Sequence, residues 1–204
     1  MFRRYKIGWI VIIGVTLLVT GAFAWMGNRP IVRPPGVLVP DEPVQVSLRD
    51  AKPIRIKGYH LTPVAQFDLK ARVLGKRYYR TDRGASLAPY DLTVGWGPMS
   101  DSDILDDLPI RLDNRAYAWD GDNVPLTTKE IILHSTNMHL IPATPGIESV
   151  IRNLREGHII RLSGKLVNVL ANDGLRWQTS TTRRDAGVGA CEIVWVERLE
   201  ILDE

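Results

Sequence analysis

The feature that most limits what this chain can fold into is an uncharged apolar run near its N-terminus. Residues 7–26 read IGWIVIIGVTLLVTGAFAWM and contain no charged side chain. A helix of this length spans roughly 30 Å, the thickness of the hydrocarbon core of a bilayer. Trp9 and Trp25 lie near the two ends of the run, where aromatic rings prefer the membrane interface. The run therefore predicts one transmembrane anchor over residues 7–26.

The residues around this run set its expected orientation. Arg3, Arg4 and Lys6 precede it, so the positive-inside rule leaves residues 1–6 as a basic cytoplasmic segment and exports the rest of the chain. Ala22-Phe23-Ala24 also has the small-x-small form of a signal-peptidase site, so cleavage after Ala24 stays open as an alternative. Both alternatives place the domain outside the cytoplasm.

The charge and the cysteine content exclude two classes of protein. Apart from the three basic residues ahead of the run, the chain has 23 Lys and Arg against 23 Asp and Glu. A neutral folded part lacks the positive surface that binds phosphate backbones, so we expect no nucleic-acid partner. The single cysteine, Cys191, excludes a scaffold held by intrachain disulfides.

The part after the anchor divides into a linker and a domain. Residues 28–43 contain five prolines, a composition typical of a stiff, extended spacer. We therefore expect a Pro-rich linker over residues 27–43 that lifts the domain off the membrane. Residues 44–204 are then one exported β-rich globular domain.

Most of that domain is expected to be β-strand. In residues 64–75 apolar and polar side chains alternate, as in a half-buried strand. Residues 157–170 and 190–202 predict two more long strands, the first with a bend at Gly164. Two shorter strands are expected at residues 91–96 and 129–134.

Two short helices interrupt this pattern. Residues 100–108 begin with Ser100 and Asp103 spaced as a capping box. The second helix begins after Thr144, which has the N-cap position, and ends at Gly157. The expected fold is mainly β with two short helices (α+β). It forms a small OB-like or partly open β-barrel after the single N-terminal transmembrane helix.

Three motifs in the chain resemble segments of other proteins. They are DLTVGWGPMSD (91–101), HSTNMHLIP (134–142) and TRRDAGVGACEIVWV (182–196). Together they resemble a family of bacterial membrane-anchored exported proteins to which no activity is attached. The resemblance implies a bacterial inner-membrane protein with its C-terminal domain in the periplasm, and it assigns no functional residue.

A candidate polar groove follows from polar residues near the expected strand ends. His134, Asn137 and His139 are expected to form one wall of this groove. The opposite wall is expected to contain Arg183, Asp185 and Glu192.

Two patterns bear on catalytic alternatives to this groove. His134 and His139 are five residues apart, a spacing that suits chelation on neither a helix nor a strand, so no metal and no other cofactor is expected. Cys191 shares strand parity with Ile193 and Trp195, which favours a buried structural thiol over a reactive one.

The predicted function is a membrane-anchored periplasmic binding or accessory module. Its expected partners are membrane lipid, through the N-terminal helix, and a protein of the cell envelope. An exported enzyme, either a Cys/His transferase or a metal-dependent hydrolase, is the alternative, and the sequence leaves open whether the protein is an enzyme.

Overall fold

The computed structural model describes residues 15, 16, 29–120, 124–182 and 190–202. The chain divides into two units, Met1–Ile31 and Val32–Glu204, and every described strand belongs to the second. Within the described residues, no helix is long and apolar enough to cross a membrane. The anchor predicted over residues 7–26 lies outside the described residues, except for Val15 and Thr16.

The described part of the second unit is mainly β-structure with short helices. In chain order, its elements are β1 (Val44–Ser47), β2 (Ile54–Ile56), β3 (Tyr59–Tyr78), β4 (Tyr90–Gly95), a 3-10 turn (Gly97–Ser100), α2 (Ser102–Asp106), β5 (Ile110–Asp113), β6 (Ala116–Trp119), α3 (Thr128–His134), β7 (Ser135–Pro142), α4 (Pro145–Asn153), β8 (Ile159–Ala171), β9 (Arg176–Trp177) and β10 (Glu192–Leu202). The prediction of a mainly β fold is confirmed.

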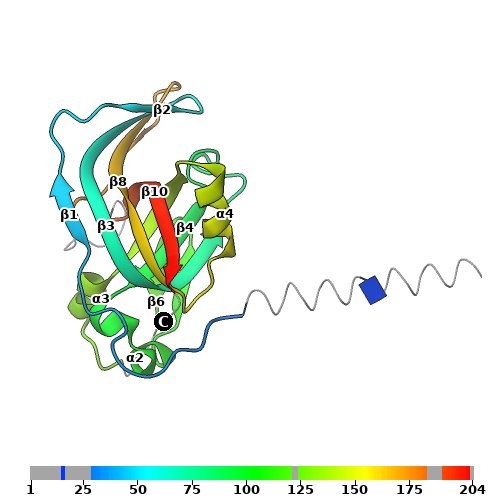
Figure 1. The fold of residues 1–204 in the computed structure, drawn as a ribbon, viewed down its shortest axis with the longest axis vertical. Coiled ribbons are helices and arrows are strands. Elements are labelled where there is room, and N and C mark those ends of the chain that lie inside the picture. The colour runs from blue at the N-terminus through cyan, green and yellow to red at the C-terminus, as the bar shows by residue number, and fades with distance from the viewer. Residues whose placement is uncertain (1–14, 17–28, 121–123, 183–189, 203–204) are drawn as a thin grey trace, which may run out of the picture. The chain divides into compact units, whose positions relative to one another are not determined.

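Five of the strands pair in a ring. β3 pairs with β4, β4 with β7, β7 with β10, β10 with β8, and β8 again with β3. The β7–β10 pairing is parallel and the other four are antiparallel. Figure 1 shows β3 and β8 as long, curved strands side by side. β5 and β6 form a separate two-stranded hairpin.

Alternation along these strands separates an apolar face from a more polar one. The largest apolar cluster collects side chains from all five ring strands, including Phe67, Leu92, Met138, Leu162 and Val194. Successive side chains of a strand point to opposite faces of a sheet. The neighbours of these residues on β4 and β7 therefore lie on the other face, which we call the outer face.

The bend predicted at Gly164 corresponds to a close approach of two strands. A Cβ atom at this position would lie 2.1 Å from the carbonyl oxygen of Trp195. The register of β8 against β10 shifts directly opposite, between Val196 and Arg198. The extra residue that shifts the register therefore lies on β10. Gly164 on β8 accommodates this bulge, because only glycine lets the two main chains approach this closely.

The strand predicted at residues 129–134 is wrong, because this segment is helix α3. Thr127 and Glu130 form a reciprocal capping box at its start, which satisfies the first free N–H groups of the helix. The described part of the second unit therefore contains three short α-helices, where the sequence predicts two. α3 ends at His134 and β7 begins at Ser135 with no intervening residue.

The two predicted helices are present with shorter bounds. The main-chain N–H of Ile147 donates to Thr144 Oγ1 over 3.2 Å, so Thr144 caps α4 as predicted. α2 is capped by Asp101 instead of Ser100. The carboxylate of Asp101 accepts from the N–H of Asp103 over 3.0 Å.

The Pro-rich segment packs against the domain instead of standing off it. The main-chain N–H groups of Leu38 and Val39 donate to Ser100 Oγ over 3.1 and 3.0 Å. Val39 is completely buried in the main apolar cluster, and Arg33 Nε donates to the Gly157 carbonyl over 2.8 Å. The prediction of a free spacer is wrong for this part of residues 27–43, because the side chains of Leu38 and Val39 pack in the core.

Candidate functional site

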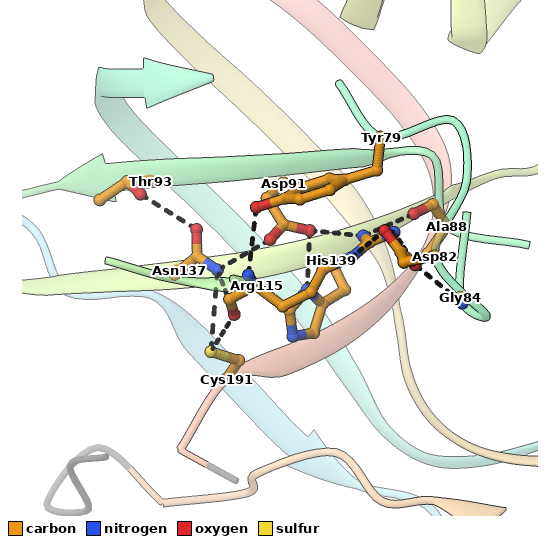
Figure 2. A network of polar contacts seen from close by, with 10 residues as sticks. All are labelled: Tyr79, Asp82, Gly84, Ala88, Asp91, Thr93, Arg115, Asn137, His139 and Cys191. Atoms are coloured by element: carbon orange, nitrogen blue, oxygen red, sulfur yellow. Dashed lines mark hydrogen bonds and ion pairs between the residues drawn. The ribbon is translucent and has the colours of Figure 1, made fainter. Parts of the chain in front are cut away.

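A buried carboxylate organises the outer face of β4 and β7. Asp91 on β4 is completely buried. Its Oδ1 accepts from Arg115 Nη1 and lies 2.8 Å from His139 Nδ1; the Arg115 distance is also 2.8 Å. Figure 2 shows these side chains converging from β4, β7 and the β5–β6 turn. A buried carboxylate is tolerated only when such partners compensate for its lost hydration.

Arg115 reaches this position from a tight turn. Asn114 and Arg115 connect β5 to β6 and have φ of 49° and 63°, the left-handed values of a two-residue type I′ hairpin turn. Such a conformation is uncommon for arginine and persists where its surroundings hold it. The Tyr79 hydroxyl accepts from the main-chain N–H of Arg115 over 3.1 Å. The guanidinium carbon lies 3.9 Å from the centre of the Tyr79 ring.

The guanidinium also fixes the loop between β3 and β4. Its Nη2 lies 2.8 Å from Asp82 Oδ1, and its Nη1 donates to the Ala88 carbonyl over 2.7 Å. Burial alone would raise the pKa of Asp82, but the hydrogen bonds and charge of Arg115 outweigh it and lower that pKa below its ordinary value. Arg115 therefore fastens the hairpin to both β4 and the loop that precedes it.

His139 is held by Asp91 and covered by an aromatic ring. A carboxylate paired with a guanidinium accepts hydrogen bonds, so Nδ1 of His139 carries the proton. The imidazole and the Trp177 ring have centroids 4.6 Å apart at an interplanar angle of 46°. No described residue makes a hydrogen bond to Nε2 of His139.

Asn137 joins this network to the cysteine. Its Oδ1 accepts from Thr93 Oγ1 over 3.0 Å, and its Nδ2 lies 3.7 Å from the sulfur of Cys191. The Cys191 thiol lies 3.6 Å from the Arg115 carbonyl. Cys191 is half-buried, so the prediction of a thiol packed in the core is wrong. Cys191 directly precedes β10, and its side chain lies on the outer face beside Asn137.

A cavity of about 310 Å³ opens beside this network. Its described lining residues come from β6, α3, the start of β7 and the two residues before β10; they are Ala116, Tyr117, Ala118, Trp119, Ile132, Ser135, Thr136, Asn137, Ala190 and Cys191. None of these side chains is a carboxylate, ammonium, guanidinium or imidazole. We call it the neutral cavity after these described lining residues, and it is large enough for a small ligand or one large side chain.

Two hydroxyl groups give the cavity wall hydrogen-bonding capacity. The hydroxyls of Tyr117 and Ser135 lie 3.0 Å apart, and Ser135 Oγ donates to the Ile131 carbonyl over 2.7 Å. Burial raises the pKa of Tyr117, and the hydrogen bond with Ser135 only partly offsets this. Tyr117 is therefore a neutral hydrogen-bonding group in this wall.

The structure brings together two of the residues of the predicted polar groove. Asn137 and His139 lie two positions apart on the outer face of β7 and share the Asp91 network. Arg183 and Asp185, expected in the opposite wall, lie outside the described residues.

Two predicted groove residues lie elsewhere. His134 is the last residue of α3, where its Nδ1 lies 2.8 Å from the Glu130 carbonyl. Glu192 shares strand parity with Val194 and is bonded by the Thr136 hydroxyl, on the opposite face of β7 and β10 from His139. The prediction that all of these residues line one groove is wrong for His134 and Glu192. One belongs to a helix, and the other has the opposite strand parity.

The sequence reasoning missed the residues that hold the site together. Asp91 has a detectable signal, since it is the one charged residue in the fully buried stretch Tyr90–Gly95. Arg115 has only a weak one, the sequence DNR at a hairpin turn. Trp177 and Tyr79 reach the site from loops or strand ends and have no local signal for it.

Among the described residues, no group of three or more His, Cys, Asp or Glu side chains could hold a metal ion. Comparison of the chain with protein-family models, curated proteins and solved structures gives no significant match. The resemblance to a family of membrane-anchored exported proteins therefore stays a prediction.

Proposed function

We propose that the domain is an OB-like barrel that acts as a binding module of the bacterial envelope. The ring β3–β4–β7–β10–β8 has the strand order of an OB fold, with one parallel pairing and with α4 between its third and fourth strands. Ligands of OB folds bind at the face of the second and third strands and at the loops beside it. Here those strands are β4 and β7, which carry Asp91, Asn137 and His139.

The observation that carries the binding role is the neutral cavity beside a rigid network. Arg115 fastens the β6 side of the cavity to Asp91 and Asp82, so the wall is ordered before a ligand arrives. Walls that are already ordered lose little conformational entropy on binding. The described lining residues carry no charged side chain, which favours an uncharged ligand group.

The location follows from the N-terminal sequence. The apolar run of residues 7–26 behind three basic residues supports a single inner-membrane pass with the domain in the periplasm. Fusions of alkaline phosphatase and green fluorescent protein to the C-terminus test this location. We expect phosphatase activity without fluorescence, and the reverse result would contradict it.

Photocrosslinking in intact cells tests the binding role. A benzophenone amino acid replaces Ala118, which lines the cavity, and in a control strain it replaces Leu170, which is 42% exposed on β8. We expect a discrete crosslinked product from position 118 that is absent from position 170. Ile132→Arg should abolish the product, because the substitution places a charge in the cavity, while Leu133→Arg on the same helix should not. Equal products from both positions, or none from position 118, would contradict the proposal.

A thiol enzyme is the second candidate, and one observation favours it. Cys191 borders the cavity and precedes Ile193, the ladder partner of His139, by two residues, so it lies on the same face as His139, whose ring is oriented by Asp91. A histidine that promotes ionisation of the thiol would make alkylation fast at neutral pH. Under this candidate, iodoacetamide labels Cys191 rapidly and His139→Ala slows the reaction. Under the binding role, labelling is slow and His139→Ala leaves its rate unchanged.

A further inference from the structure

One edge of β6 has no partner strand among the described residues. Alternate residues of an antiparallel hairpin direct their main-chain groups toward the partner strand. In the β5–β6 hairpin these include Ala118 and Asp120, whose N–H donates to the Pro109 carbonyl over 3.2 Å. Tyr117 and Trp119 therefore direct their N–H and C=O groups away from β5.

This edge borders the neutral cavity. Tyr117 and Trp119 both line it, and Ala190 and Cys191 line its other side. The preceding outward group, the Arg115 carbonyl, is bonded by Asn137 and Cys191. In the part of the chain that the structure describes, nothing bonds the main-chain groups of Tyr117 or Trp119.

We infer that an extended, uncharged peptide segment of a partner protein adds to β6 as a further strand and places an apolar side chain in the cavity. This inference rests on the proposed binding role and names its ligand class. Strand addition at an open sheet edge is a recurring mode of peptide recognition, in which main-chain hydrogen bonds give affinity and side-chain pockets give selectivity.

The arrangement of groups distinguishes a peptide strand from a compact ligand. Successive outward residues of a strand are about 6.8 Å apart, so Tyr117 and Trp119 present two donor–acceptor pairs at the repeat of another strand. The cavity of about 310 Å³ lies at the level of these two residues. Its described lining residues include Ile132, Tyr117 and Trp119, which can make apolar contacts, and none of them carries a charge to pair with a charged side chain.

Amide hydrogen exchange of the free protein is the first test. The full-length chain in lipid nanodiscs is labelled with ¹⁵N, and exchange is followed residue by residue. We expect the amides of Tyr117 and Trp119 to exchange faster than that of Ala118, which the hairpin already protects. Equal protection of the three amides in the free protein would overturn the inference, because the edge would then be occupied.

Selection of peptides is the second test. A random-sequence peptide library is panned against the full-length chain in nanodiscs and counter-selected against the Ile132→Arg variant. We expect enriched peptides to be uncharged, to contain a large apolar residue and to slow exchange at Tyr117 and Trp119. Two versions of such a peptide are compared, one N-methylated at the odd residues and one at the even residues. One version should bind about tenfold more weakly or worse and the other nearly unchanged, because only one set of N–H groups faces β6.

The outcomes separate this inference from the proposed function. In one outcome, enriched peptides bind the wild type and Leu133→Arg but not Ile132→Arg, with the same affinity whichever alternate set of residues is N-methylated. This result would uphold the cavity as a binding site and overturn strand addition. No enriched peptide at all would likewise overturn the inference. The crosslinking experiment at position 118 would still test whether the cavity binds ligands other than peptides.

Discussion

Arg115 Nη1 lies 2.8 Å from Asp91 Oδ1, and this pair fastens the tip of the β5–β6 hairpin to the outer face of β4. The two residues are 24 positions apart in the chain. The same guanidinium bonds Asp82 and stacks on Tyr79, so one side chain connects three segments. This connection holds β6 in place as one wall of the neutral cavity.

Replacing Arg115 with alanine should strongly destabilise the domain. The substitution leaves the carboxylate of Asp91 buried without its guanidinium partner, and removing one member of a buried ion pair typically lowers the unfolding free energy by about 3–5 kcal/mol. Urea denaturation measures the loss. Arg83→Ala is the matched control, because the Arg83–Asp173 pair is exposed and should contribute about 1 kcal/mol or less. Similar losses in both variants would contradict the role assigned to Arg115.

Val39→Ala tests whether the Pro-rich segment belongs to the folded domain. Val39 is completely buried, so shortening its side chain should lower the unfolding free energy by about 2 kcal/mol. Val32→Ala, at a side chain that is 93% exposed, should change it by about 0.5 kcal/mol or less. A loss at Val39 no larger than at Val32 would show that the segment is a spacer after all.

Gly164→Ala should disrupt the pairing of β8 with β10. The added methyl group would overlap the Trp195 carbonyl, a main-chain atom that cannot move without displacing β10. We expect a lower midpoint of thermal unfolding, measured by circular dichroism. Gly146→Ala is the control, since a Cβ there meets only Thr144 Oγ1 at 3.7 Å and alanine suits the helix α4. Equal midpoints in the two variants would contradict the close approach.

The pH dependence of stability should reveal Tyr117. Burial raises its pKa, so the folded protein holds the phenolic proton more tightly than the unfolded chain does. The resulting stability is fully present below the unfolded pKa of about 10 and is lost as pH rises through the raised folded pKa. Tyr117→Phe should therefore flatten the decline in unfolding free energy above about pH 10. An identical decline in wild type and variant would refute the buried environment.

The sequence predicts a helix or strand correctly where the pattern of apolar residues fits only one of the two. The alternation in β3 extends over many residues and predicts a half-buried strand in the correct range. The apolar run Ile131–Ile132–Leu133 fits both a buried strand and a short helix, so periodicity could not decide it. The capping box of Thr127 and Glu130 lies just before this run and was the informative signal.

The candidate site could be predicted only where its residues share one strand. Asn137 and His139 alternate along β7, so their common face follows from the sequence. Their connection to Asp91 depends on the register of β4 against β7, and that to Arg115 on a turn far along the chain. Such relationships arise from tertiary packing, and no local pattern encodes them.

The direct passage from α3 into β7 at His134 and Ser135 leaves this junction without tolerance for changes in chain length. Inserting or deleting one residue there would rotate each following side chain of the strand to the other side of the sheet. Met138 and Leu140 would then face the outside, while Asn137 and His139 would enter the apolar interior. We therefore expect homologous chains to conserve the number of residues at this junction.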